Sequence, residues 1–142
     1  MAGHQRSEAA VGAIRWAAER LGEGGKLVVV HACRPLHAPP SPLLSREERL
    51  ALGRAEMDEL LLEEAETLEG LELATEVLDE DPVSALLGAV TRHGADAIVV
   101  GSEHRSAARR ALGVVTTELL SRSPVPLFAI PGGVGGRVAP RG

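Results

Sequence analysis

Aromatic side chains are almost absent from this sequence. Of its 142 residues only Trp16 and Phe128 are aromatic, and there is no tyrosine. A hydrophobic core must therefore be built from aliphatic side chains, which an apolar content of 44% can supply. The scarcity of aromatic rings also excludes a platform on which single-stranded nucleic acid would stack its bases.

Cysteine, long apolar runs and excess positive charge are lacking too. Cys33 is the single cysteine, which excludes an intrachain disulfide and a cysteine-rich zinc site and indicates a reducing, cytoplasmic setting. No stretch approaches the roughly 18 to 20 apolar residues of a membrane span, and the first residues show no signal-peptide core. With 15 basic and 20 acidic residues the formal charge is −5, so we expect neither a nucleic-acid nor a membrane partner.

Helical and extended patterns alternate along the chain. Apolar spacing predicts helices over 7–21, 45–68, 82–93 and 107–122, with Ser7 as the N-cap of the first. Strands are predicted over 26–31 and 97–101, both buried on two faces, over 71–78 at the sheet edge, and over 126–130. This order is typical of an α/β fold, an open, mostly parallel sheet with helices on both faces. We expect one domain over 7–131, followed by a flexible tail over 132–142 that is rich in glycine and proline.

The ends of these elements carry clear signals. Residues 45–48 form a capping-box pattern, and Asp81 followed by Pro82 is typical of a helix start. Gly22, Gly70 and Gly94 are placed to end the preceding helices. Four prolines between residues 34 and 42 predict a loop.

Ligands of such sheets bind beyond the carboxyl ends of the strands, so the loops there are searched first. Asp79, Glu80 and Asp81 could act in acid–base chemistry or bind Mg²⁺, but a turn and a helix cap explain them without chemistry, and we favour that interpretation. The glutamates at 63, 64, 66, 69 and 72 indicate a solvated face.

Two other clusters are ambiguous. The segment 101–106 follows a buried strand and could offer backbone N–H groups to a phosphate, helped by the arginines at 105, 109 and 110; it is also explained by a glycine-containing turn before a basic helix face, and no Walker loop is present. His31, Cys33 and His37 could approach a metal, but no acidic residue or fourth ligand lies close in sequence, so no metal is expected.

Several segments together resemble the universal stress protein family. They lie at 7–8 with 14–18, 27–31, 75–78 with 81–82, 93–102 and 124–126, and the resemblance spans about 7–131. It implies an adenine nucleotide alpha hydrolase-like fold with strand order 3-2-1-4-5. It also implies a nucleotide held at the carboxyl edge of the sheet, and dimerisation often through the last strand.

The sequence departs from the family's phosphate motif, G-x2-G-x9-G-(S/T). Gly101 is kept, His104 replaces the second glycine, one residue is missing before Gly113, and Val114 replaces the hydroxyl residue. A histidine side chain would enter space that glycine leaves for phosphate oxygens. A surviving ATP site would use the backbone of Ala32, Gly101, Gly113 and Val114, with His104 in the loop and Arg105 near phosphate.

A second departure concerns the family's apolar first strand, which lies at the centre of the sheet. Only residues 1–6 precede the first predicted helix. Each buried backbone N–H or C=O group that is left unpaired at a strand edge costs about 1–3 kcal/mol of folding free energy. Three explanations stay open: the strands at 26–31 and 97–101 pair directly, a segment of another chain lies between them, or the true start codon lies upstream.

These features predict a stress-response or regulatory protein that is not an enzyme, although slow ATP hydrolysis is compatible with them. In this hypothesis ATP binding is weakened or lost, and the protein, a homodimer through its last strand, acts by contact with a protein partner. In the alternative, it binds ATP or AMP and works as a nucleotide-gated sensor. A nucleotidyl-transfer enzyme of related architecture is disfavoured, because its phosphate loop and basic and hydroxyl motifs are absent.

Overall fold

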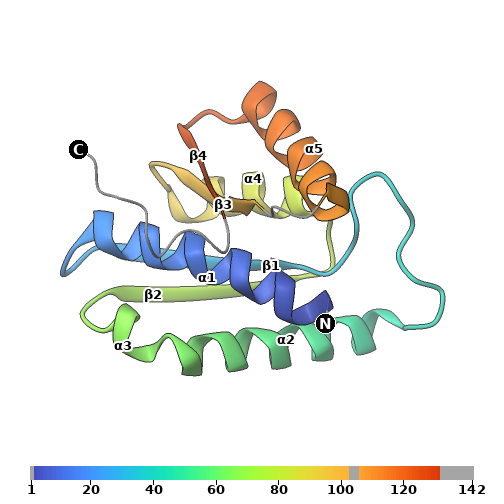
Figure 1. The fold of residues 1–142 in the computed structure, drawn as a ribbon, viewed down its shortest axis with the longest axis horizontal. Helices are drawn as coiled ribbons and strands as arrows, with labels where there is room; N and C mark the ends of the chain where they lie inside the picture. The colour runs from blue at the N-terminus through green and yellow to red at the C-terminus, as the bar shows by residue number, and fades with distance from the viewer. Residues whose placement is uncertain (1, 103–105, 132–142) are drawn as a thin grey trace.

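Helices and strands alternate along the described chain, except where two helices follow each other between the first and second strands (Figure 1). The computed structural model describes residues 2–102 and 106–131, and side-chain surroundings within 10–101 and 113–130. The elements are α1 (Ala2–Leu21), β1 (Lys26–Ala32), α2 (Arg46–Glu63), α3 (Ala65–Leu68), β2 (Glu72–Leu78), α4 (Pro82–His93), β3 (Ile98–Ser102), α5 (Ser106–Arg122) and β4 (Leu127–Pro131). The predicted α/β fold with parallel strands is confirmed. In the described part of the chain, no helix is both long and apolar enough to cross a membrane.

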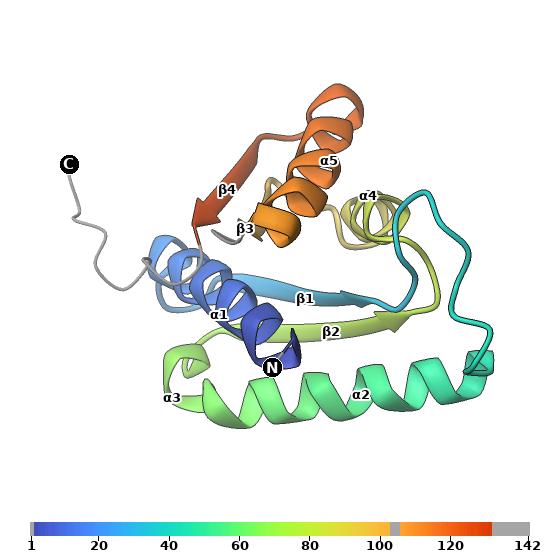
Figure 2. The same cartoon turned by 45° about the vertical axis from the view of Figure 1, so that its right-hand side comes forward.

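The strands form two separate parallel pairs in place of one continuous sheet. β1 pairs with β2 from Lys26 opposite Glu72 to Ala32 opposite Leu78, and β3 pairs with β4 from Ile98 opposite Leu127. Figures 1 and 2 show the order β2, β1, β3, β4, so that β1 and β3 are the inner strands of the two pairs. No described residue joins β1 to β3 by strand pairing, so the explanation that the sheet has closed up is wrong.

The helices cover two different cores. On one face, α1 and α2 pack on the first pair around Ile14, Val29 and Met57. On the other face, α4 and α5 pack on the second pair around Val83, Val100 and Leu119 among others. α1 also contacts β3 and β4, and α4 also contacts β1, so these two helices hold the half-sheets together.

The predicted end signals act as expected. The Ser45 hydroxyl accepts a hydrogen bond from the N–H of Glu48, while the Glu48 carboxylate accepts one from the N–H of Ser45, which completes the capping box. Asp81 caps α4 and Pro82 is its first residue. Gly94 ends that helix at φ +62°, a left-handed conformation that favours glycine.

Three details of the expected elements are wrong. Ser7 lies inside α1, which begins at Ala2, because the residues before it include no proline to stop the helix. β1 is less buried than expected, with only Val29 fully buried, because one edge of the strand has no neighbour among the described strands. The long helix is divided at Glu64 into α2 and α3.

The prediction that Glu64 lies on a solvated face is also wrong. Its side chain is only 4% exposed and receives two hydrogen bonds from Arg15 of α1, at 2.8 and 3.0 Å. The hydroxyl of Thr67 donates a third at 3.2 Å. A glutamate can be buried here because its charge is paired and its oxygens are hydrogen-bonded.

Candidate functional site

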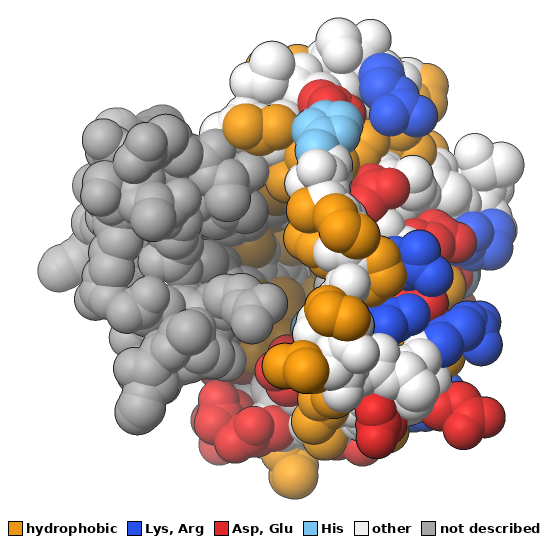
Figure 3. Space-filling model, turned by 90° about the vertical axis from the view of Figure 1, so that its right-hand side faces the viewer, with side chains coloured by type: hydrophobic (Ala, Val, Ile, Leu, Met, Phe, Trp, Pro, Cys, Tyr) orange, Lys and Arg blue, Asp and Glu red, His pale blue; other side chains and the backbone are white. Residues whose placement is uncertain are grey.

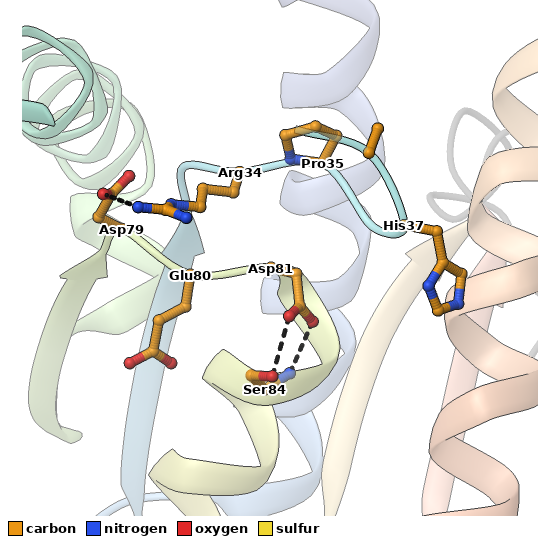
Figure 4. Close-up of a pocket in the computed structure, with 8 residues that line it drawn as sticks. Arg34, Pro35, His37, Asp79, Glu80, Asp81 and Ser84 are labelled. Atoms are coloured by element: carbon orange, nitrogen blue, oxygen red, sulfur yellow. Dashed lines mark hydrogen bonds and ion pairs between the residues drawn. The ribbon is translucent and has the colours of Figure 1, made fainter. Parts of the chain in front are cut away.

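An open pocket of about 490 Å³ lies where β1 and β2 end. The loop after β1 forms one side and the turn between β2 and α4 forms the other (Figure 4). The lining residues are Arg34, Pro35, His37, Ala38, Asp79, Glu80, Asp81 and Ser84. The pocket therefore lies at the sheet edge where α/β proteins bind ligands.

Asp79 is the most strongly held side chain in this pocket. Its carboxylate is 2% exposed and accepts two hydrogen bonds from Arg49 of α2, at 2.8 and 3.0 Å. Arg34 donates a third at 2.9 Å, and the guanidinium of Arg46 lies 3.6 Å away. The bonds from Arg49 and then Arg34 hold the pKa of Asp79 far below its usual range. Asp79 is thus ionised near neutral pH and connects the end of β2 to α2 and to the loop after β1.

Asp81 has a second structural task. One carboxylate oxygen accepts from the backbone N–H of Ser84 and the other from its hydroxyl, both at 2.9 Å (Figure 4). Burial raises the pKa of Asp81, but these bonds outweigh it, so the pKa lies below its ordinary value. A carboxyl group that stays ionised and caps a helix cannot serve as a general acid near neutral pH. The favoured interpretation of this residue as a helix cap is confirmed.

Glu80 completes the acidic run. Its side chain is exposed and points away from Arg34 in Figure 4. The described pocket lining thus contains three carboxylates and a single arginine, whose charge is engaged by Asp79. Such a lining favours cationic or neutral groups over phosphate.

The loop after β1 reaches across to α5. His37 lies at the far end of the pocket and forms an ion pair with Glu118 of α5 when its ring is protonated. His37 has φ +62°, which is uncommon for a residue other than glycine. Figure 3 views the molecule from the side toward which β1 and β2 run, and shows a column of hydrophobic side chains beside charged ones.

Cys33 is enclosed at the same edge of the sheet. Its thiol donates to the carbonyl oxygen of Arg49 at 3.5 Å, and burial, together with the charge of Asp79, raises the thiol's pKa. A Cβ on Gly53 would lie 3.0 Å from the Cys33 sulfur, so α2 packs closely over it. A raised pKa disfavours the reactive thiolate. Within the described residues no group of three or more His, Cys, Asp or Glu side chains could hold a metal ion.

The structure describes only some of the residues that are predicted to hold a nucleotide. Ala32 is the last residue of β1 and Gly101 lies near the end of β3, on either side of the unpaired edges. Gly113 and Val114 lie inside α5, where their backbone N–H groups point along the helix, and both are exposed. His104 and Arg105 lie outside the described residues. A phosphate-binding role for this set stays a prediction.

The arginine cluster around Asp79 was missed by reasoning from the sequence. Its signal was present in the topology, because adjacent parallel strands end at the same edge and so bring residue 34 close to residue 79. Arg46 and Arg49 are three residues apart in the first turn of a capped helix and share one face. The acidic run gave no indication of which carboxylate would face them.

Comparison with known proteins agrees with this fold. The sequence model of the universal stress protein family matches residues 1–131. A crystal structure of a universal stress protein family member from Burkholderia pseudomallei superposes with a TM-score of 0.61 at 23% identity, covering 89% of this chain and 86% of that one. One from Arabidopsis thaliana with AMP bound gives 0.56 at 21% identity, covering 90% and 81%. No curated protein matches. At these identities the structures show the fold, while the family match spans nearly all of the sequence: this chain belongs to the universal stress protein family.

Proposed function

We propose that this protein is a stress-response or regulatory protein with weakened or lost ATP binding, that it is not an enzyme, and that it acts by contacting a protein partner in the cytoplasm. The acidic pocket is the observation that carries the proposal. Asp79, Glu80 and Asp81 lie side by side at the end of β2, and the arginines nearest to them are engaged with Asp79. A polyphosphate entering from this edge would meet the carboxylates of Glu80 and Asp81, while the charge of Arg34 is paired with Asp79.

The altered phosphate motif supports the same proposal from the sequence. Val114 cannot donate a side-chain hydrogen bond to a phosphate, and its side chain is 46% exposed on α5. Gly113 lies in the interior of that helix, so its N–H belongs to the helical hydrogen-bond ladder. A phosphate site at this place would depend on the remaining loop residues.

A nucleotide-gated sensor is the second candidate. The observation that favours it is the structurally similar Arabidopsis thaliana protein with AMP bound. Backbone cradles for phosphate depend on geometry more than on side chains, and Gly101 remains at the end of β3. Slow ATP hydrolysis belongs to this candidate.

Calorimetric titration with Mg-ATP and with AMP separates the two candidates. The first predicts no binding at micromolar nucleotide, whereas a micromolar Kd for either nucleotide would favour the sensor. Glu80→Lys and Glu72→Lys form a matched pair, because both glutamates are exposed, but Glu72 is the first residue of β2 and Glu80 follows the end of that strand. If the acidic edge repels phosphate, the Glu80 variant alone gains affinity for ATP.

We also propose a homodimer through the last strand. β4 pairs with β3 on one side only among the described strands, and Phe128 on it is 40% exposed. An edge strand with an exposed ring is suited to pair with a second copy. Light scattering that gives a mass near 14.8 kDa, the monomer value, would contradict the dimer.

A further inference from the structure

The loop between β1 and α2 is fixed at both of its ends. At its start the guanidinium of Arg34 donates a hydrogen bond to Asp79 at 2.9 Å. At its end the carbonyl oxygen of Leu44 accepts one from Arg49, also at 2.9 Å. We call the segment between these two anchors, residues 35–43, the strap, because it forms one side of the pocket and reaches across to α5.

The strap itself is weakly held. Four of its nine residues are prolines, which have no backbone N–H to donate. In the described part of the chain, no backbone–backbone hydrogen bond joins the strap to another element. Leu36 packs against the core formed by α4 and α5, whereas Leu43 is 87% exposed. The packing of Leu36 and the ion pair of His37 with Glu118 hold the strap against α5.

His37 lies where the strap meets α5 (Figure 4). Its Nε2 is paired with Oε2 of Glu118, while Oε1 of the same carboxylate lies 3.9 Å from Nη1 of Arg122, one turn along the helix. The carboxylate therefore keeps a cationic neighbour when the ring of His37 is neutral, so its ionisation does not depend on the strap.

The other charged groups described around the pocket have separate partners or point elsewhere. Asp79 is engaged by Arg34, Asp81 caps α4, and Glu80 is exposed and points away from the strap in Figure 4. Among the described residues, the ring of His37 is paired with a single carboxylate, that of α5. The charge on this ring thus acts mainly on the contact between the strap and α5.

We infer that the strap is a pH-sensitive closure of the pocket: it is held on α5 while the His37 ring is protonated, and it leaves α5 and opens the pocket when the ring is neutral. Histidine is the side chain that ordinarily changes its charge between about pH 5 and 8. Loss of the proton turns a charge-assisted pair between two ions into a weaker contact. The φ of +62° at His37 is a costly conformation for a residue other than glycine, and release of the strap relieves it.

An exposed ion pair is weak, so it can control only a segment that is otherwise close to balance. The strap meets this condition, because it has no backbone ladder and one packed leucine. Its release removes Pro35, His37 and Ala38 from the pocket lining. This inference goes beyond the proposed function and does not depend on it, since the pocket changes shape whatever it binds.

Backbone ¹⁵N relaxation measured by NMR on the full chain tests the closure. Spectra are recorded at about pH 5.5 and about pH 7.5, on either side of the middle of the range in which histidine titrates. The order parameters of Leu36, His37 and Ala38 should be about 0.85, the value of rigid backbone, at the lower pH, and about 0.6 or less at the higher one. Val29 and Val100, in the strands, should stay rigid at both. Equal order parameters for the strap at the two pH values would overturn the inference.

Variants of His37 separate its charge from its shape. Asparagine tolerates a positive φ but carries no charge, so His37→Asn should leave the strap mobile at both pH values. His37→Lys, which is charged at both, should keep it rigid at both. Glu118→Gln should behave like the asparagine variant. A pH dependence that persists in His37→Asn would overturn the inference, because another group would then be responsible.

His93→Asn is the matched control. His93 also pairs with a glutamate, Glu76 at 2.5 Å, but it lies at the end of α4 and does not line the pocket. The strap of this variant should respond to pH as the parent does. Loss of the response in His93→Asn would show that histidine charge acts through the fold as a whole, and the inference would be wrong.

Discussion

The ring centroids of Trp16 and Phe128 lie 4.9 Å apart, with the ring planes inclined by 38°. These are the sequence's single tryptophan and its single phenylalanine, and each is the other's partner. Their contact ties α1 to β4, while Arg15 of the same helix bonds Glu64 beside α2. α1 thus fastens together two half-sheets that share no strand pairing among the described residues.

Replacing Phe128 by alanine should weaken the contact between α1 and β4. The ring is 40% exposed, so the loss in unfolding free energy should be about 1–2 kcal/mol, below the 3–5 kcal/mol typical of a fully buried phenylalanine. Urea denaturation measures the loss, and the fluorescence of Trp16 in the folded state should shift to the red. Leu120→Ala, at a side chain that is 66% exposed on α5, is the control and should change stability by less than about 0.5 kcal/mol.

Gly53→Ala should destabilise the protein by about 1–3 kcal/mol, because α2 lies too close to β1 and β2 for a side chain there. The new Cβ would lie 2.8 Å from Cγ1 of Val77 and 2.9 Å from Cδ2 of His31. Thermal and urea unfolding measure the effect.

Gly113→Ala is the matched control within α5. No described atom lies within 4 Å of a Cβ added at this position. Alanine favours a helix over glycine by up to about 1 kcal/mol, so this variant should be neutral or more stable. Equal destabilisation by both substitutions would show that close packing at Gly53 is not the cause.

Local signals predicted most of the fold, because they act over a few residues. The capping box at Ser45, the Asp81 cap and the left-handed Gly94 are each determined by neighbours within one helical turn. The division of the sheet was not predictable in the same way. It depends on whether β1 and β3 pair through backbone hydrogen bonds, which is determined by tertiary packing.

The site was less predictable than the fold. In the sequence Asp79 and Asp81 belong to one acidic run. In the structure Asp79 is hydrogen-bonded by arginines from two other elements, whereas Asp81 caps a helix. Charge pairing across the fold depends on side-chain direction at the ends of strands. Glu64 shows the same limit, since its partner Arg15 lies 49 residues away in sequence.

Glu64→Gln should destabilise the protein by about 1–2 kcal/mol, since it weakens two hydrogen bonds to a charged group at a side chain that is only 4% exposed. Glutamine keeps the shape, so a packing defect is avoided. The change in urea midpoint measures the loss. Glu66→Gln, at an exposed position of α3, should change stability by less than about 0.5 kcal/mol; a comparable loss there would mean that general charge balance, and not the pair with Arg15, is responsible.

Asp79 should make stability depend on pH in the acidic range. The bonds from Arg49 and Arg34 hold its folded pKa below the unfolded value of about 3.9. A group with a lowered folded pKa contributes its full stability above the unfolded pKa and loses it as pH falls toward the folded one. The unfolding free energy of the protein should therefore fall below about pH 4, and Asp79→Asn should remove part of that fall. The variant should be less stable than the parent at pH 7, and the difference in unfolding free energy should narrow as the pH drops.

Asp58→Asn, at an exposed position of α2, is the control and should follow the parent curve. A constant difference between the parent and Asp79→Asn from pH 7 to pH 2 would show that shape and hydrogen bonding, not the charge of Asp79, hold β2, α2 and the loop after β1 together.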